Sequence, residues 1–330
     1  MNRTRPPATL SLDLDNLWAY LRVRGDSAWE SFPSYFDRAV PRILSFLRAR
    51  RLEITFFVVG QDAARDESVE AIASVAAAGH EIANHSFHHL PWMHMNSGQE
   101  IEEELSRSEE AIERVTGRHT TGFRGPGFSL SLPMLEALKR RGYLYDASTF
   151  PTFIGPLARA YYFARAKFGA AQARHLRGLY GNLRDGLRPL RPYRWELGEG
   201  GLLEIPVTTF PGVRLPVHLS YLLFLAQRSP AAARSYFRAA LRACRITRTP
   251  MSLLLHPTDF LGREDVPQMS FFPGMTMPAE AKLELLSDVL AALCKEFSVL
   301  PMGQFARQLL DSKTLPAATP DFAVTGRPAC

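Results

Sequence analysis

Short apolar runs alternate with amphipathic patterns along the first half of the chain. Five runs are typical of buried strands, at residues 9–15, 53–59, 80–84, 121–123 and 143–145. Helical periodicity predicts helices between them, at residues 35–50, 68–78, 97–116 and 131–141. Strands that alternate with helices indicate a parallel sheet covered by helices, either open or closed into a barrel.

The same alternation returns in the second half of the chain. Strands are predicted at residues 202–207, 251–255 and 297–300, and helices at 230–245 and 279–295. Residues 218–227 are apolar and fit either a core helix, which we favour, or a groove for lipid tails. We expect one α/β barrel domain over residues 1–312 and a disordered tail over 313–330.

Residues 150–201 interrupt this alternation, and we interpret them as a helical insertion over the barrel mouth. Arginine, aromatic and leucine side chains are frequent within its part 158–194, where Asp185 is the acidic residue. Such a composition suits either an anionic membrane surface or a solvated helix pair packed on the barrel. Both interpretations stay open.

Composition and charge indicate where the protein is located and which partners it favours, but they do not indicate its reaction. The chain has 330 residues, 46% of them hydrophobic, and a net charge of +6, which favours anionic partners. Cys244, Cys294 and Cys330 lie far apart and form no disulfide framework. The basic N-terminus lacks an apolar run behind it, and no stretch reaches the roughly 20 apolar residues of a membrane span. We expect a cytoplasmic location and, despite the charge, no nucleic acid as partner.

Two acidic residues stand at the end of the first predicted strand. Asp13 and Asp15 are two positions apart, so alternation places both carboxylates on one side of the strand. Buried carboxylates are unfavourable unless they are paired or bind a metal. A solvated strand end is the alternative explanation for this pair.

The sequence NHSFHH follows the third predicted strand. His85 and His89 are four positions apart, which on one helical turn places both imidazoles on the same face. Asp15 with these two histidines would leave coordination positions open for water and substrate, as catalytic zinc sites require. We expect a divalent metal here, with zinc favoured over cobalt, nickel or manganese.

Two further segments carry candidate chemistry at strand ends. In FRGPGFS, Arg124 can hold a carboxylate in position, and the turn at Gly127 and Phe128 allows the backbone to approach a ligand. In LLLHP, His256 ends an apolar strand, and histidine is a residue type that commonly donates protons in catalysis. Standing alone, FRGPGFS is better explained as an ordinary turn with a solvated arginine, whereas His256 is explained equally well as a histidine that caps a strand.

Taken in order, six segments resemble the polysaccharide deacetylase family, also called the NodB-homology or carbohydrate esterase 4 family. They are the Asp13–Asp15 pair, TFFVVG, HSFHH, RGPGF, YDAS and LLLH. The resemblance is close over about residues 9–148 and looser over about 202–310. It implies a distorted (β/α)7-type barrel and metal-dependent hydrolysis of an N-acyl group on an amino sugar.

The resemblance also implies a role for each residue. Asp13 would be the catalytic base, oriented by Arg124, and His256 the general acid. Asp15, His85 and His89 would bind the metal, while Gly127 and Phe128 would contact the oxyanion or the substrate. The chain departs from the family in three ways. Its acids form D-L-D and not an adjacent pair, Gly127 stands where the third motif usually has an aromatic residue, and no Asp-x-x-Trp motif is present to tune His256.

The sequence therefore predicts a carbohydrate N-deacetylase acting on an acetyl or formyl group. The basic insertion favours a lipid-linked or nucleotide-linked amino sugar, with the protein peripheral at the inner membrane face. The alternatives are a hydrolase of a non-sugar amide or cyclic imide, and a non-catalytic glycan-binding barrel.

Overall fold

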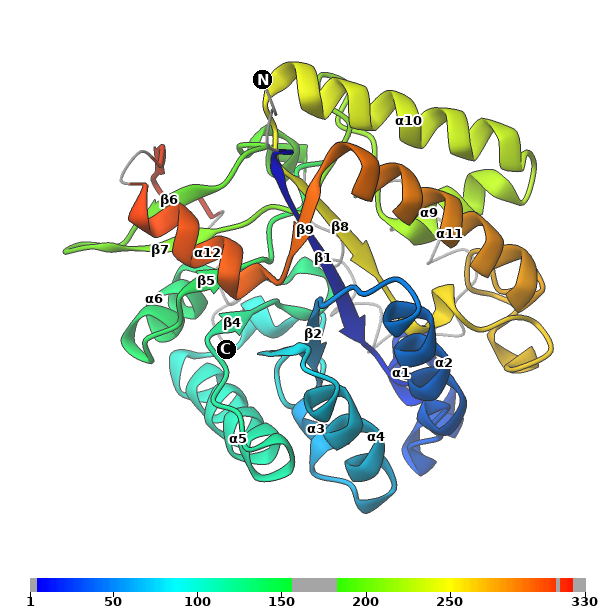
Figure 1. The fold of residues 1–330 in the computed structure, drawn as a ribbon. Helices are drawn as coiled ribbons and strands as arrows, with labels where there is room; N and C mark the ends of the chain where they lie inside the picture. Colours follow the sequence, from blue (N-terminus) through cyan, green and yellow to red (C-terminus); the bar gives the residue numbers. More distant parts are fainter. Residues whose placement is uncertain (1–4, 156–182, 313–314, 323–330) are drawn as a thin grey trace.

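The computed structural model describes residues 5–155, 183–312 and 315–322 (Figure 1). Most of the basic segment 158–194 therefore lies outside the described residues. Helices surround a central, largely parallel sheet on its outer side (Figure 1), which confirms the α/β class predicted from the sequence. Among the described helices, none combines the length and apolar character that crossing a membrane requires.

Ten strands form the sheet, in the order β10-β6-β7-β5-β4-β3-β2-β1-β8, with β9 pairing with β1. The β6–β7 pair is antiparallel and the other pairs are parallel. Their bounds are β1 Pro7–Leu14, β2 Thr55–Val58, β3 Glu81–Asn84, β4 Gly122–Phe123, β5 Tyr145–Asp146, β6 Tyr193–Glu196, β7 Gly201–Glu204, β8 Met251–Leu255, β9 Ser298–Leu300 and β10 Ala317–Ala318.

The ring of strands closes through an irregular segment that follows β7. Ile205 N donates to the Asp146 carbonyl, and Thr208 N donates to the Ser252 carbonyl of β8. Seven strands (β1, β2, β3, β4, β5, β7 and β8) thus surround one interior, with the gap between β7 and β8 spanned by loop backbone. The result is a distorted barrel.

Alternation along β1 separates its two faces. Leu10, Leu12 and Leu14 pack in the main hydrophobic core with residues of the surrounding helices. Ser11 and Asp13 face the barrel interior, where both contact Arg124. In the sequence TLSLDL, the apolar side chains therefore point outward to the helices and the polar side chains point into the barrel. A sheet with one solvent-exposed face shows the opposite pattern, with its polar side chains pointing outward.

The helices are α1 Leu17–Arg24, α2 Phe36–Arg48, α3 Gly60–Ala63, α4 Asp66–Ala77, α5 Gly98–Thr116, α6 Leu132–Arg140, α9 Leu219–Ala226, α10 Pro230–Thr247, α11 Ala279–Glu296 and α12 Met302–Asp311. Local signals explain their ends. Ser97 and Glu100 form a capping box at the start of α5, and Gly117 ends it in the left-handed conformation. Ser229 caps α10, which opens with Pro230.

Helix α12 fills part of the barrel interior, although its pattern was not recognised in the sequence. Met302, Phe305 and Ala306 pack against Phe57 and Tyr145, which face inward from β2 and β5. The first amides of α12 donate to Thr55 Oγ1 and to the Glu81 carboxylate. Unpaired N–H groups at a helix start thus meet polar side chains of two strands.

Three segments differ from or refine the expectation. Residues 193–196, placed in the helical insertion, form strand β6. The tail is not loose throughout: β10 pairs with β6, and Phe322 packs against Trp195 at 5.7 Å between ring centroids. The apolar segment 218–227 contains helix α9, whose Leu219, Leu222 and Leu223 are buried in the core, as favoured.

Candidate metal centre and active site

The carboxyl ends of three neighbouring strands bring the candidate ligands to one edge. Leu14 of β1 is in register with Val58 of β2, and Val58 with Asn84 of β3. Asp15 and His85 each follow directly after these positions. Since parallel strands end at the same edge of a sheet, both side chains arrive at the same level.

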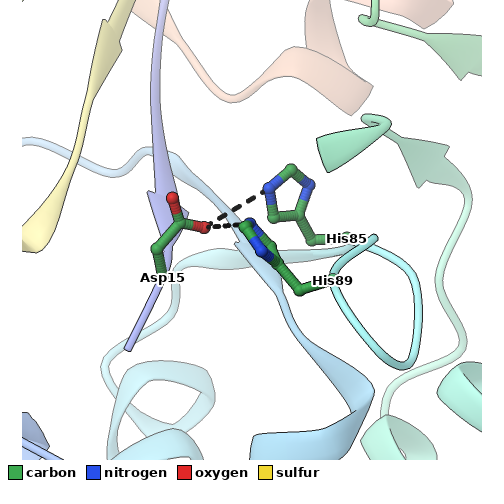
Figure 2. Close-up of side chains that lie close together, drawn as sticks. All are labelled: Asp15, His85 and His89. Carbon is green, nitrogen blue, oxygen red and sulfur yellow. Dashed lines mark ion pairs between the residues drawn. The ribbon is translucent and has the colours of Figure 1, made fainter. Parts of the chain in front are cut away.

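Asp15, His85 and His89 converge on one point (Figure 2). The Asp15 Oδ1 atom lies 3.1 Å from His89 Nε2 and 3.4 Å from His85 Nε2. One nitrogen or oxygen of each residue lies within 4.8 Å of the others, and all three residues are buried. This spacing matches atoms that surround a common cation.

The histidines lie on a loop and not on a helical turn, which corrects the expectation from their spacing. Residues 85–89 have no helical assignment, and both Ser86 (φ 62°) and His89 (φ 52°) adopt the left-handed conformation. Asn84 supports this loop because its Oδ1 accepts bonds from Ser86 N and Ser108 Oγ, both at 2.8 Å. The two imidazoles therefore converge through loop geometry.

The hydrogen bonds of these residues fit a bound metal. His85 Nδ1 lies 2.6 Å from the Arg124 carbonyl, which can only accept, so Nδ1 carries the hydrogen and Nε2 is free to coordinate. Asp15 Oδ1 and His89 Nδ1 are buried without a hydrogen-bond partner among the described residues. One carboxylate and two imidazoles form a donor set that zinc and related divalent ions accept.

Even without a metal, the charges of Asp15, His85 and His89 shift one another's protonation equilibria. Burial raises the pKa of Asp15, but the facing His89 and His85 outweigh it and hold that pKa well below its usual range. Burial lowers the pKa of His85, but Asp13 and Asp15 outweigh it and raise the net value. The site therefore favours a positive charge beside its carboxylates, which a cation can supply.

Arg124 and Asp13 form a fully buried ion pair next to the ligands. Arg124 has no exposed surface, and its Nη1 donates to Asp13 Oδ1 at 2.5 Å and to Ser11 Oγ at 3.0 Å. Its Nε donates to the Ala147 carbonyl at 3.0 Å. The other Asp13 oxygen lies 3.9 Å from His85 Nε2. Arg124 thus fixes one oxygen of Asp13 and leaves the second facing the candidate metal site.

His256 lies at the same edge on the other side of β1. Leu12 and Leu255 are in register, so His256 is level with Asp13 on the neighbouring strand. Ser220 Oγ lies 3.4 Å from His256 Nδ1 and donates to Asp259 Oδ1 at 3.3 Å. The second Asp259 oxygen accepts the His256 amide.

Sequence reasoning missed this support for His256. The supporting acid is Asp259, three residues after His256 in the sequence HPTD. Asp259 is 1% exposed, and Lys282, also buried, donates to the Thr258 and Leu261 carbonyls beneath it. The H-P-T-D spacing was visible, but the contribution of Ser220 from α9 was not.

The predicted substrate turn has an unusual backbone conformation. Gly127 (φ 59°) and Phe128 (φ 61°) are both left-handed within the turn Pro126–Phe128. A Cβ on Gly127 would lie 3.1 Å from Pro91 Cβ, so the turn is closely packed there. Phe128 stacks on Phe150 with 4.7 Å between centroids.

A second buried acid, also missed, lies behind the metal ligands. Asp62 Oδ1 accepts bonds from Trp18 Nε1 at 2.8 Å and Asn16 Nδ2 at 2.9 Å. Burial raises the pKa of Asp62 to about 7. Trp18 in turn packs edge-on against His89, with 6.3 Å between centroids. Asp62 therefore helps to hold the ring that flanks a ligand.

The other histidines of this region are engaged elsewhere. His88 pairs with Glu104, and His94 Nδ1 lies 2.9 Å from Ser129 Oγ. Neither belongs to the group of converging ligand atoms. The choice of His85 and His89 within NHSFHH thus agrees with the geometry.

Comparison with known proteins points to one family. Residues 25–145 match the polysaccharide deacetylase family. The peptidoglycan-N-acetylmuramic acid deacetylase PdaA of Bacillus subtilis strain 168 is 33% identical over 110 residues, covering 33% of this chain and 41% of the relative. The peptidoglycan deacetylase of Helicobacter pylori is 31% identical over 109 residues, covering 33% and 36%. The chain thus spans about two fifths of these relatives.

A solved structure extends the likeness to the whole chain. The crystal structure named "putative polysaccharide deacetylase from Mycobacterium smegmatis" aligns with 98% of this chain and 97% of its own, at 23% identity and a TM-score of 0.65. His85, His89 and Arg124 fall inside the family match, whereas Asp13, Asp15 and His256 lie outside it and join them only in space. The resemblance seen in the sequence is therefore supported: residues 25–145 match the polysaccharide deacetylase family, and the whole chain shares the fold of the solved structure.

Proposed function

We propose that this protein is a metal-dependent deacetylase that hydrolyses an N-acyl amide on an amino sugar. The observation that carries the proposal is the convergence of Asp15, His85 and His89 beside the Asp13–Arg124 ion pair. Family membership alone would leave activity open, because a barrel of this kind can lose its chemistry. Here the metal donors and a positioned carboxylate lie within reach of one another.

Asp15, His85 and His89 would hold the metal, for which zinc is our first choice and cobalt, nickel or manganese the alternatives. A divalent ion in such a site polarises the acyl carbonyl and lowers the pKa of water. The Asp13 oxygen that faces the ligands accepts the proton of the attacking water, while Arg124 holds the other oxygen. A backbone N–H of the Gly127–Phe128 turn would stabilise negative charge on the acyl oxygen.

His256 would donate a proton to the departing amine. It follows β8, which pairs with β1 on the side away from β2, and would approach the amide from the side opposite His85 and His89. Ser220 and Asp259 orient its Nδ1 side, which leaves Nε2 to face the substrate. Two proton-transfer groups on opposite sides of one amide are what its cleavage needs, since one proton leaves water and another must reach the nitrogen.

The substrate class is proposed from the relatives and from the charge of the chain. Two relatives are named as peptidoglycan deacetylases, so an N-acetylated amino sugar of a glycan is the leading candidate. A lipid-linked or nucleotide-linked amino sugar, met at the inner face of the cytoplasmic membrane, is the narrower proposal. It depends on the basic segment 158–194, most of which lies outside the described residues.

A panel of substrates tests both the proposed reaction and the narrower substrate proposal. The protein is incubated with zinc, cobalt, nickel or manganese and with N-acetyl and N-formyl amino sugars, either free, in glycan oligomers, nucleotide-linked or polyprenyl-linked. Released acetate or formate is measured. Hydrolysis only with metal present supports the proposal. A cyclic imide hydrolysed in preference to every sugar would replace it.

Asp13→Asn separates the base from the ligands. The variant should bind metal normally, because Asp13 is not among the converging donors, and should lose at least ~100-fold in kcat, as expected for a lost general base. Elemental analysis and rates measured on the same sample check this. Asp37→Asn, an exposed acid on α2, is the matched control. A near-normal rate for Asp13→Asn would remove it from the mechanism.

A further inference from the structure

Two carboxyl groups lie buried together behind the active site without a cation. Asp146 ends β5 and Glu204 ends β7, and their Cα atoms are partners in the parallel register. Both residues have no exposed surface. Their side chains come within hydrogen-bonding reach of each other, and no lysine or arginine of the described residues offsets their charge.

The donors around the pair leave one oxygen without a partner. Glu204 accepts bonds from Thr149 N and Trp195 Nε1, both at 2.9 Å. Asp146 Oδ1 accepts from Ser148 Oγ at 2.6 Å. Asp146 Oδ2 is buried and has no donor among the described residues. A single proton between the carboxyl groups would supply that donor and remove the repulsion of two adjacent anions.

The proton belongs on Glu204. Burial, followed by the charge of Asp146, raises the pKa of Glu204 well above its usual range. Burial also raises the pKa of Asp146, but the bond from Glu204 and the bond from Ser148 act against that rise. A protonated Glu204 that donates to Asp146 Oδ2 satisfies every oxygen of the pair.

Ser148 connects the pair to the active site. Because its hydroxyl donates to Asp146, its lone pair is turned toward Gly125, whose N–H it accepts at 2.8 Å. The preceding carbonyl, that of Ala147, accepts Arg124 Nε. Residues 147 and 148 therefore anchor both Arg124, which holds Asp13, and Gly125, which directly precedes the turn Pro126–Phe128.

The anchored turn has little room to move. A Cβ on Gly125 would lie 2.0 Å from the Ser129 carbonyl oxygen, so this backbone is packed against itself. Phe128 N donates back to the Gly125 carbonyl at 3.0 Å. A shift of Gly125 would therefore carry Phe128 with it.

We propose that Asp146 and Glu204 share one proton and, through Ser148, position the Arg124–Phe128 segment for catalysis. Both are positioning residues, since they reach the site only through Ser148. The ionisable groups that face the pair are Tyr193 of β6 and, acting on Tyr193, Arg188. The catalytic consequence rests on the proposed deacetylase function, whereas the shared proton does not.

Hydrogen exchange at the Gly125 amide tests the connection without any substrate. In Ser148→Ala this amide loses its acceptor, and its exchange should rise at least ~10-fold. Ser252→Ala is the matched control, because Ser252 is also buried but its hydroxyl has no hydrogen bond among the described residues. Unchanged protection in Ser148→Ala would overturn the link.

Asp146→Asn tests the shared proton. It places a permanent N–H at the oxygen that lacks a donor and keeps the acceptor for Ser148, so Gly125 protection should persist, whereas Asp146→Ala should lose it. In the wild type the folded state keeps a proton that the unfolded chain releases above about pH 4.3. Stability should therefore fall as pH rises toward the raised pKa of Glu204. Asp146→Asn should lack that fall, and a pH-independent difference in Tm would overturn the shared proton.

Kinetics test the positioning. Ser148→Ala should lower kcat by ~10-fold or more through misplacement of the turn, with KM within about 2-fold and metal content unchanged. Asp146→Ala should lower kcat in the same way, and Asp146→Asn, which keeps the acceptor for Ser148, should recover most of that loss. An unchanged kcat in Ser148→Ala would overturn the catalytic role. If the wild type hydrolyses none of the panel, the proposed function fails, while exchange and stability still decide on the pair.

Discussion

The candidate site depends on a charged side chain that is fully buried, that of Arg124. Arg124 is fully enclosed yet carries a charge, and it is tolerated because Asp13, Ser11 and the Ala147 carbonyl satisfy its donors. Phe57 lies under its guanidinium at 4.1 Å. Such a group stabilises a structure only together with its partner, since removing one member leaves the other charged and unpaired.

Arg124→Met tests this dependence. The variant keeps most of the side-chain volume but leaves Asp13, which is 5% exposed, without its counterion. The free energy of unfolding should fall by about 3–5 kcal/mol at neutral pH, as for other broken buried pairs. Urea denaturation measures it. Arg140→Met removes an exposed ion pair with Glu102 and should cost at most about 1 kcal/mol. Equal effects in the two variants would contradict the argument.

Protons and metal compete for His85. Because its pKa is raised in the metal-free protein, its charged form contributes stability that is fully present below its unfolded pKa of about 6.5 and is lost as pH rises through the raised value. The lowered pKa of Asp15 acts in the opposite sense, so its contribution is lost only when pH falls through that low value.

Zinc affinity should therefore depend on pH. Below the raised pKa of His85, binding must displace one proton, and affinity should fall about tenfold for each pH unit. Competition with a chromophoric chelator between pH 6 and 8.5 measures this slope, and calorimetry in buffers of different ionisation enthalpy measures the released proton. His88→Ala, outside the ligand group, should keep the slope. A pH-independent affinity would show that His85 does not bind the ion.

At the scale of elements, the connection after β3 decides whether the histidines meet. Spacing alone predicted a helical face, and the prediction of convergence held for a different reason. Asn84 and Ser108 tie down a loop in which two non-glycine residues are left-handed, a conformation that costs energy and persists only when its surroundings enforce it. Spacing cannot reveal such a loop, because its support comes from α5.

Asn84→Ala should release that loop. The change removes acceptors for Ser86 N and Ser108 Oγ and a donor to Tyr143 OH, without touching a ligand. Metal affinity should drop about 10–100-fold, as for other residues that orient ligands from behind. Isothermal titration with zinc checks it. Asn96→Ala, in the same connection and without a side-chain hydrogen bond among the described residues, is the control. Wild-type affinity in Asn84→Ala would mean that the loop holds itself.

Strong local periodicity made most elements predictable, and the failures share a cause. The helices at 97–116 and 230–245 carry caps and long apolar stripes, so their positions were close to those observed. Strands β6 and β10 were missed because two to four residues carry too little periodicity, and the strand that β10 pairs with lies far away in sequence. Helix α12 is short and its buried face turns into the barrel, where Arg124 and Thr55 make the surroundings polar.

At the scale of the whole molecule, the site is assembled from distant segments. Asp13 and Asp15 lie at the end of β1. His85 and His89 follow β3, Arg124 follows β4, and His256 follows β8. Each was visible as a polar residue at the end of an apolar run, because parallel strands deliver such residues to one edge. The supporting roles of Ser220, Asp259 and the Asp146–Glu204 pair were not predicted, because nothing local distinguishes a residue that supports the site from one that merely caps a strand or helix.

A metal that joins the first strand to the loop after β3 should stabilise the entire fold. An ion bound only by the folded state adds about 2.7 kcal/mol at a free concentration 100 times its Kd. The Tm should therefore rise with zinc and fall with a chelator. Asp15→Asn and His89→Ala should abolish the zinc-dependent shift, whereas Asp13→Asn should keep it, because Asp13 faces the ion without being one of its three converging donors. Magnesium is a control, since it prefers oxygen ligands and should shift Tm little at a site with two imidazoles. If His89→Ala kept the full zinc shift, the stabilising ion would be bound elsewhere on the protein and the convergence of these three side chains would have another explanation.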